Sequence, residues 1–371
     1  MKDINSKRKY IHGFDALRGL AALLVIVGHV ELIKSSLGYE NVYYGGGPFF
    51  LYLGSLSVTF FFVLSGFLIT YLLLIEKSLT GKIGLKNFYL RRALRIWPVY
   101  YILFIMGFIV LPIIYKHLII STTPILPNDY WSSFIANVLL LPNFIKPGNP
   151  VAFQSWSIGV EEQFYILWPL LFIYIKSLKK LTVAMIFIVV FIFLLRSTII
   201  LPKILDINTN IFLSLNRFFG ESRFDNMAIG GLAGIYFYLK PNISLPIWIK
   251  CSSLALTSYI LIYTTEFGFG LDNIIAAISF AFLLIIVATT DNISVLEIKV
   301  FKFLGRISYG LYMYHVVGII IVLNLMKVIF PDFNGQWHLN IMLHLASIIT
   351  TIIIANLSYT YVEKYFLKFK K

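Results

Sequence analysis

Residues 14–33 read FDALRGLAALLVIVGHVELI, a run of 20 mostly apolar residues. A transmembrane helix needs about 20 such residues to cross the hydrocarbon core of a bilayer. The run contains Asp15, Arg18 and His29 and has no clear small-residue cleavage site. We therefore interpret it as a membrane span of the mature protein and not as a secretory signal peptide.

The composition of the whole chain agrees with a membrane protein. Of its 371 residues 59% are hydrophobic and 13% charged, whereas soluble domains have roughly 45–50% and ~25%. The net charge of +14 lies in short clusters between apolar runs, as expected for topology signals and headgroup contacts rather than for nucleic-acid binding. The single cysteine, Cys251, excludes an intramolecular disulfide and a multi-cysteine zinc site; we expect it to be a small core residue.

The apolar runs predict an all-α fold, a polytopic helical bundle with about ten transmembrane helices in one domain, 1–371, without a fused soluble domain. A shorter helix is expected around residues 131–141. The predicted spans are 14–33, 52–75, 97–115, 159–175, 181–200, 223–239, 246–265, 272–290, 307–329 and 340–360.

The lysines and arginines predict the orientation of the chain. If the N-terminus is cytoplasmic, most of the 31 basic residues fall on the cytoplasmic side. The positive-inside rule then places both termini in the cytoplasm of a multi-pass cell-membrane protein.

Two ionisable residues of the first span suggest a function. Arg18 and His29 are eleven positions apart, which is about 16 Å of helix and close to three turns. They therefore project from nearly the same face, with Arg18 near the cytoplasmic end and His29 toward the outer half. Ionisable groups in a bilayer mark functional sites or internal pairing; the alternative is a headgroup anchor and a hydrogen-bonded core histidine.

The fourth span opens with QSWSIGVEEQFY, residues 154–165, which contains Trp156, Glu161 and Glu162. Adjacent positions point about 100° apart on a helix, so at most one of the two carboxylates can face a given partner. At the depth of His29 a carboxylate could orient the imidazole and raise its basicity. The alternative is that these acids only suit a helix N-terminus.

Three further clusters remain open to two interpretations each. Ser65 and Gly66, in FFFVLSGFLIT (60–70), allow close approach by another helix or by a thin ligand. The basic run RRALRIWPVY (91–100) signals topology or recognises phosphate; its arginines are Arg91, Arg92 and Arg95. The third cluster forms ion pairs or binds a polar acceptor, and it comprises Arg217, Glu221, Arg223 and Asp225.

Together these segments resemble the acyltransferase-3 family of bacterial membrane proteins, many of which O-acetylate cell-surface polysaccharides. The family's motifs match residues 18–29, 61–67, 91–100 and 155–165, and its terminal signature matches FLGRISYGLYMYH at 303–315. The motif Glu-x-Pro-Phe is not reproduced, because residues 363–366 read EKYF. The hydrolase-like domain that is fused to some members is not expected here.

The resemblance implies roles for the matched residues. His29 would be the catalytic base, supported by Arg18, with Glu161 or Glu162 as its acidic partner. Arg91, Arg92 and Arg95 would bind an acyl-CoA at the cytoplasmic face. Ser65, Gly66, Trp156, Arg223 and Asp225 are further candidates for substrate binding. His315 fits the signature without a defined catalytic role, and the alternative for it is packing or hydrogen bonding. Neither a metal nor a tightly bound cofactor is expected.

The predicted activity is the transfer of an acyl group, acetyl in the first instance, from cytoplasmic acyl-CoA to a hydroxyl of a cell-surface or lipid-linked carbohydrate. The alternative is a transporter or flippase of a polar or lipid-linked glycan, in which the same residues would form a proton or substrate path. The sequence leaves open the acceptor, the length of the acyl group and the oligomeric state.

Overall fold

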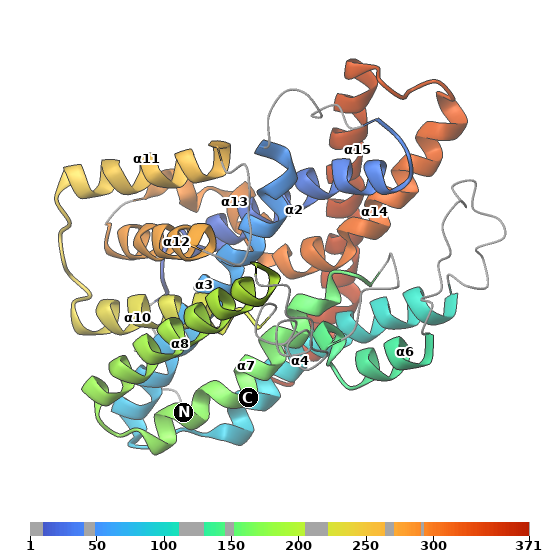
Figure 1. Ribbon diagram of the computed structural model, residues 1–371. Coiled ribbons are helices and arrows are strands. Elements are labelled where there is room, and N and C mark those ends of the chain that lie inside the picture. Colours follow the sequence, from blue (N-terminus) through green and yellow to red (C-terminus); the bar gives the residue numbers. More distant parts are fainter. Residues whose placement is uncertain are drawn as a thin grey trace. The chain divides into compact units, whose positions relative to one another are not determined.

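The computed structural model describes residues 10–40, 49–110, 130–144, 152–204, 222–263, 271–290 and 293–370. All regular secondary structure in these ranges is helical (Figure 1), which confirms the all-α fold. The longer helices are α2 (Phe14–Ser36), α3 (Phe49–Thr80), α4 (Leu85–Ile105), α7 (Ser155–Tyr174), α8 (Leu178–Ile204), α10 (Phe224–Leu239), α11 (Ile247–Tyr263), α12 (Leu271–Thr289), α14 (Ser308–Ile329) and α15 (Trp337–Ser358).

Shorter helical segments connect or extend these helices. The expected short helix near residue 131 is α6. The segments are η1 (Met106–Val110), α6 (Tyr130–Val138), η3 (Pro142–Phe144), η4 (Ser294–Glu297), α13 (Lys299–Arg306), η5 (Tyr359–Glu363) and α16 (Lys364–Leu367).

The protein is a multi-pass membrane protein, and each of the ten predicted spans overlaps a helix. Within the described ranges, six helical stretches are long and apolar enough to cross a membrane. They are Phe14–Ser36, Tyr52–Thr80, Leu85–Val110, Leu271–Thr289, Ser308–Ile329 and Trp337–Leu367. That α7, α8, α10 and α11 also cross it stays a prediction.

Two details of the sequence interpretation were wrong. The helix predicted at 97–115 begins at Leu85 instead. Its first turns were missed because residues 85–96 mix basic and apolar side chains and therefore lack the hydropathy of a span. Residues 111–115 lie outside the described ranges. Cys251 is exposed on α11 and not in the core, since the buried positions of that helix are Ser253, Thr257 and Ile260.

The chain forms two compact units, each assembled from separate stretches. Unit 1 comprises the described parts of Met1–Leu17, Val58–Lys86 and Val160–Lys302. Unit 2 comprises those of Arg18–Ser57, Asn87–Gly159 and Phe303–Lys371. The prediction of a single functional domain across 1–371 stays a prediction.

Small residues bring helices together in unit 1. A Cβ added to Gly66 of α3 would collide with the main chain of Met227 on α10, and one added to Gly230 would collide with that of Val63. Glycine allows helix backbones to approach this closely. Small residues are common at helix interfaces in membranes, because the hydrophobic effect does not drive helices together in lipid. The buried amides of Asn226 and Asn273 exchange hydrogen bonds of 3.3 and 3.1 Å beside this contact.

A buried polar network links α2 to α15 in unit 2. The Lys34 Nζ donates to Glu31 Oε1 at 3.0 Å and to Asn340 Oδ1 at 2.6 Å. His344 Nε2 lies 3.8 Å from the same Glu31 oxygen. Both Lys34 and Glu31 are almost completely buried, so each charge depends on the other for its stability in the folded protein.

Candidate active site

The helix α2 holds His29 in one tautomer. The Nδ1 atom lies 2.8 Å from the carbonyl oxygen of Val25, one turn earlier on the same helix. A carbonyl can only accept a hydrogen bond, so Nδ1 carries the proton in the neutral ring. The lone pair is therefore on Nε2, and the half-buried His29 has the form that a general base requires.

Three residues of unit 2 surround the His29 ring. Its centroid lies 5.4 Å from that of Phe153 and 4.7 Å from that of His315. On α3, Gly54 leaves the space that the ring occupies, because a Cβ at this position would be only 2.7 Å from His29 Cε1. The imidazole is therefore held by packing as well as by its hydrogen bond to Val25.

His315, for which the sequence indicated no catalytic role, packs against His29 in this site. It lies on α14 and is completely buried. Its Nδ1–H donates to the carbonyl oxygen of Tyr312 at 2.6 Å, so its lone pair is also on Nε2. That nitrogen has no hydrogen-bond partner among the described residues.

Residues at the start of α7 are tied to α14 next to the two histidines. Gln154 Nε2 donates to the carbonyl oxygen of Met313 at 2.7 Å. The hydroxyls of Ser157 and Tyr312 share a hydrogen bond of 2.6 Å. Gln154 and Ser157 lie within a sequence motif but had no predicted role. Only their polar character next to apolar residues could have indicated these bonds.

The basic residues of the sequence motifs gather elsewhere in unit 2. Arg18 on α2 and the three arginines of α4 are half-buried. Although the Lys370 side chain is accessible, partial desolvation and then the positive charges of Arg95, Arg92, Arg91 and Arg18 lower its pKa to about 8. The five cations therefore create a positive region of the kind that attracts phosphate.

Near this region the chain departs from the family's Glu-x-Pro-Phe motif. Tyr365 stands in place of the proline and lies within α16, which directly follows the π-helical turn Tyr359–Glu363. The Glu363 side chain is buried and interacts electrostatically with Arg95. The acid of the motif is thus part of the basic region, although the proline is missing.

The two predicted glutamates belong to unit 1, whereas His29 belongs to unit 2. Glu161 accepts hydrogen bonds from Ser65 Oγ at 3.1 Å and from Tyr165 OH at 2.9 Å. Glu162 is buried, with 9% of its surface exposed. The contact of Ser65 with Glu161 joins two of the sequence motifs, and the pairing of either glutamate with His29 stays a prediction.

The other candidate residues have separate positions. Arg223 precedes α10 with a left-handed backbone, φ 47°, and both it and Asp225 are buried. Trp156 is half-buried on α7. Gly66 contacts the main chain of α10, which favours its packing interpretation over ligand approach. Arg217 and Glu221 lie outside the described residues, and the substrate role of the described ones stays a prediction.

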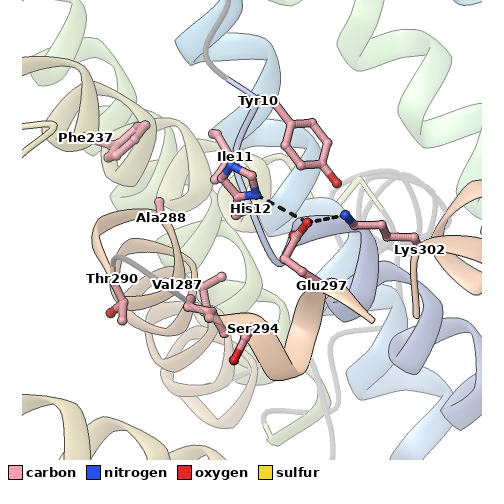
Figure 2. A pocket seen from close by; sticks show the side chains of 11 residues that line it. Tyr10, Ile11, His12, Phe237, Val287, Ala288, Thr290, Ser294, Glu297 and Lys302 are labelled. Atoms are coloured by element: carbon pink, nitrogen blue, oxygen red, sulfur yellow. Dashed lines mark ion pairs between the residues drawn. The ribbon is translucent and has the colours of Figure 1, made fainter. Parts of the chain in front are cut away.

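Unit 1 also contains a pocket that no sequence motif indicated. Figure 2 shows Glu297 between His12 and Lys302, with N–O distances of 3.3 and 2.8 Å, and the N–H of Gly13 donates to the same carboxylate at 2.7 Å. Burial raises the pKa of Glu297, but the bonds from Lys302, Gly13 and His12 outweigh this effect and lower it to about 2. These contacts connect residues 12–13 to η4.

Among the described residues no cluster of metal-ligating side chains occurs.

Comparison with known proteins places this arrangement in a family. The sequence profile of an acyltransferase domain, Acyl_transf_3, matches residues 11–359. O-acetyltransferase OatA of Staphylococcus aureus is 28% identical over 377 residues, covering 96% of this chain and 57% of the relative. The putative peptidoglycan O-acetyltransferase YrhL of Bacillus subtilis is 26% identical over 378 residues, covering 96% and 55%.

The chain thus spans somewhat more than half the length of the curated relatives it matches. No solved structure matches it. Since the acyltransferase profile extends over almost the whole chain and includes His29, Arg18 and the three arginines of α4, the protein belongs to the acyltransferase-3 family.

Proposed function

We propose that the protein transfers an acetyl group from cytoplasmic acetyl-CoA to a hydroxyl of a cell-surface or lipid-linked carbohydrate, with His29 as the general base. The observation that carries the proposal is the hydrogen bond from His29 Nδ1–H to the Val25 carbonyl. It leaves Nε2 unprotonated in a half-buried ring, ready to accept a proton from an incoming hydroxyl.

The donor fits the positive region around Arg18, Arg91, Arg92 and Arg95. Coenzyme A has an anionic, phosphate-bearing head and a long thin arm that ends in the thioester. Guanidinium groups suit the phosphates, because they form paired, charge-assisted hydrogen bonds. Arg18 and His29 both lie on α2, about 16 Å apart along the helix axis, a separation that the extended arm of the donor spans.

The chemical step follows from these positions. The acceptor oxygen attacks the thioester carbonyl while its proton passes to His29 Nε2. The carbon–sulfur bond then breaks, and the departing thiolate of coenzyme A takes the proton from the imidazolium. General-base assistance of this kind contributes roughly 10²–10⁴ to a rate, so the loss of His29 should remove nearly all transfer.

The acceptor is proposed from the relatives and from the orientation expected for the chain. With both termini in the cytoplasm, His29 lies toward the outer half of the membrane, where an extracytoplasmic hydroxyl could reach it. YrhL is named as a putative peptidoglycan O-acetyltransferase, so peptidoglycan is the first acceptor to test. Glu161 or Glu162 would support His29 as its acidic partner.

Membranes that contain the protein, incubated with acetyl-CoA labelled in the acetyl group, test this function. The His29→Gln variant should fail to label the glycan fraction, whereas a His338→Gln variant, altered at an exposed histidine of α15, should label it like the parent. Equal labelling by the His29→Gln variant and the parent would remove His29 from the chemistry. If no fraction is labelled by the parent with native glycan present, the proposal of transfer is wrong and glycan transport becomes the better hypothesis.

A further inference from the structure

His315 has a buried nitrogen atom that the proposed mechanism does not use. The side chain has 0% of its surface exposed, and its Nε2 has no hydrogen-bond partner among the described residues. An unsatisfied buried acceptor costs stability, whereas an apolar side chain of similar shape would avoid this cost. Such an atom therefore requires an explanation, and a role in catalysis is one that accounts for its presence.

The ring next to His315 is that of His29. The two centroids are 4.7 Å apart and the ring planes meet at 60°. Each Nδ1–H donates to a carbonyl of its own helix, Val25 for His29 and Tyr312 for His315. Both rings therefore present an unprotonated Nε2, and because like charges this close repel each other, the pair accommodates one proton far more readily than two.

We propose that His315 is a positioning residue that acts through His29. Its ring fixes the orientation of the His29 imidazole, and its neutral Nε2 stabilises the imidazolium that His29 becomes during the reaction. This inference rests on the proposed acetyl transfer. The hydroxyl proton of the acceptor passes to His29 and then to the thiolate of coenzyme A, so His315 is neutral before and after each turnover.

Two substitutions of His315 separate this role from packing. In His315→Gln the side-chain amide extends far enough to place an oxygen acceptor near the position of Nε2, whereas in His315→Asn the shorter amide reaches only the position of Nδ1. His315 Nε2 has no hydrogen bond in the resting protein. A hydrogen bond that forms only to the charged imidazolium of His29 would change the rate by about 10- to 100-fold. We expect His315→Asn to lower kcat by about this factor with KM for acetyl-CoA unchanged, and His315→Gln to recover most of the loss.

The matched control is His344→Asn. His344 is also a buried histidine of unit 2 whose Nδ1 contacts a carbonyl of its own helix, that of Asn340 at 2.9 Å, but it is placed in the Glu31 network. We expect this variant to lower thermal stability and to keep the kcat of the folded protein. All variants are compared as monodisperse detergent-purified protein.

The outcomes of these assays distinguish a positioning role of His315 from packing and from failure of the proposed function. A kcat for His315→Asn equal to that of the parent would overturn the inference while leaving the proposed function intact. Equal losses in the Asn and Gln variants would show that only packing matters and would also overturn it. A parent that transfers no acetyl group would overturn the proposed function and, with it, this inference. A low kcat in the Asn variant that the Gln variant restores supports it.

Discussion

Substitution of Gly54 by alanine should impair catalysis by displacing His29. The new Cβ would lie 2.7 Å from His29 Cε1 and 3.0 Å from Nδ1. Carbon atoms in contact prefer separations of about 3.5 Å or more, so the ring or α3 must move by about 0.8 Å. Because a misplacement of about 1 Å can cost 10²-fold in rate, we expect kcat to fall by about 10- to 100-fold.

The assay is the transfer of labelled acetyl groups by purified Gly54→Ala protein, with kcat expressed per folded molecule. The control is Gly318→Ala on α14, where a Cβ would collide with Thr351 and not with a histidine. Both changes overpack unit 2, at a cost of about 1–3 kcal/mol in the free energy of unfolding. If Gly54→Ala retains the parental kcat while being destabilised like the control, the position of the His29 ring does not limit the reaction and this prediction is wrong.

Three further predictions concern other charges. The pKa of Glu297 is about 2 in the folded protein, below its ordinary 4.5. Its ionised form therefore adds stability above pH 4.5, and this stability is lost as the pH falls toward 2. The thermal unfolding temperature of Glu297→Gln should depend less on pH between 4.5 and 2 than that of the parent. Lys34→Met leaves the Glu31 charge buried without its cation and should lower the free energy of unfolding, measured in urea, by about 3–5 kcal/mol. The double variant Lys34→Met with Glu31→Leu should recover this stability. Arg95→Gln should raise KM for acetyl-CoA by about 10- to 100-fold with little change in kcat; an unchanged KM would contradict a donor site there.

The helical architecture could be predicted because hydropathy depends on sequence alone. Every predicted span overlaps a helix, and the run that contains Arg18 and His29 is the single helix α2. The start of α4 was missed because its first turns are basic, so that composition and helical structure diverge there.

Contacts between distant parts of the chain could not be predicted in this way. The proximity of His315 to His29 and the space left by Gly54 depend on how three helices pack, and no local pattern encodes that packing. Glu31 and Lys34, at i and i+3 near the end of a span, did offer a local signal of a buried ion pair. No local sequence signal indicated the hydrogen bond between Ser65 and Glu161.

We propose that an acyl group taken up on the side of the arginines is transferred at His29 to an acceptor on the other side of the membrane. Proteoliposomes of the purified protein, with labelled acetyl-CoA outside and muropeptide acceptor enclosed, test this directly. We expect label on the enclosed acceptor with the parent and none with His29→Gln. Label that appears only on acceptor supplied on the same side as acetyl-CoA would contradict it.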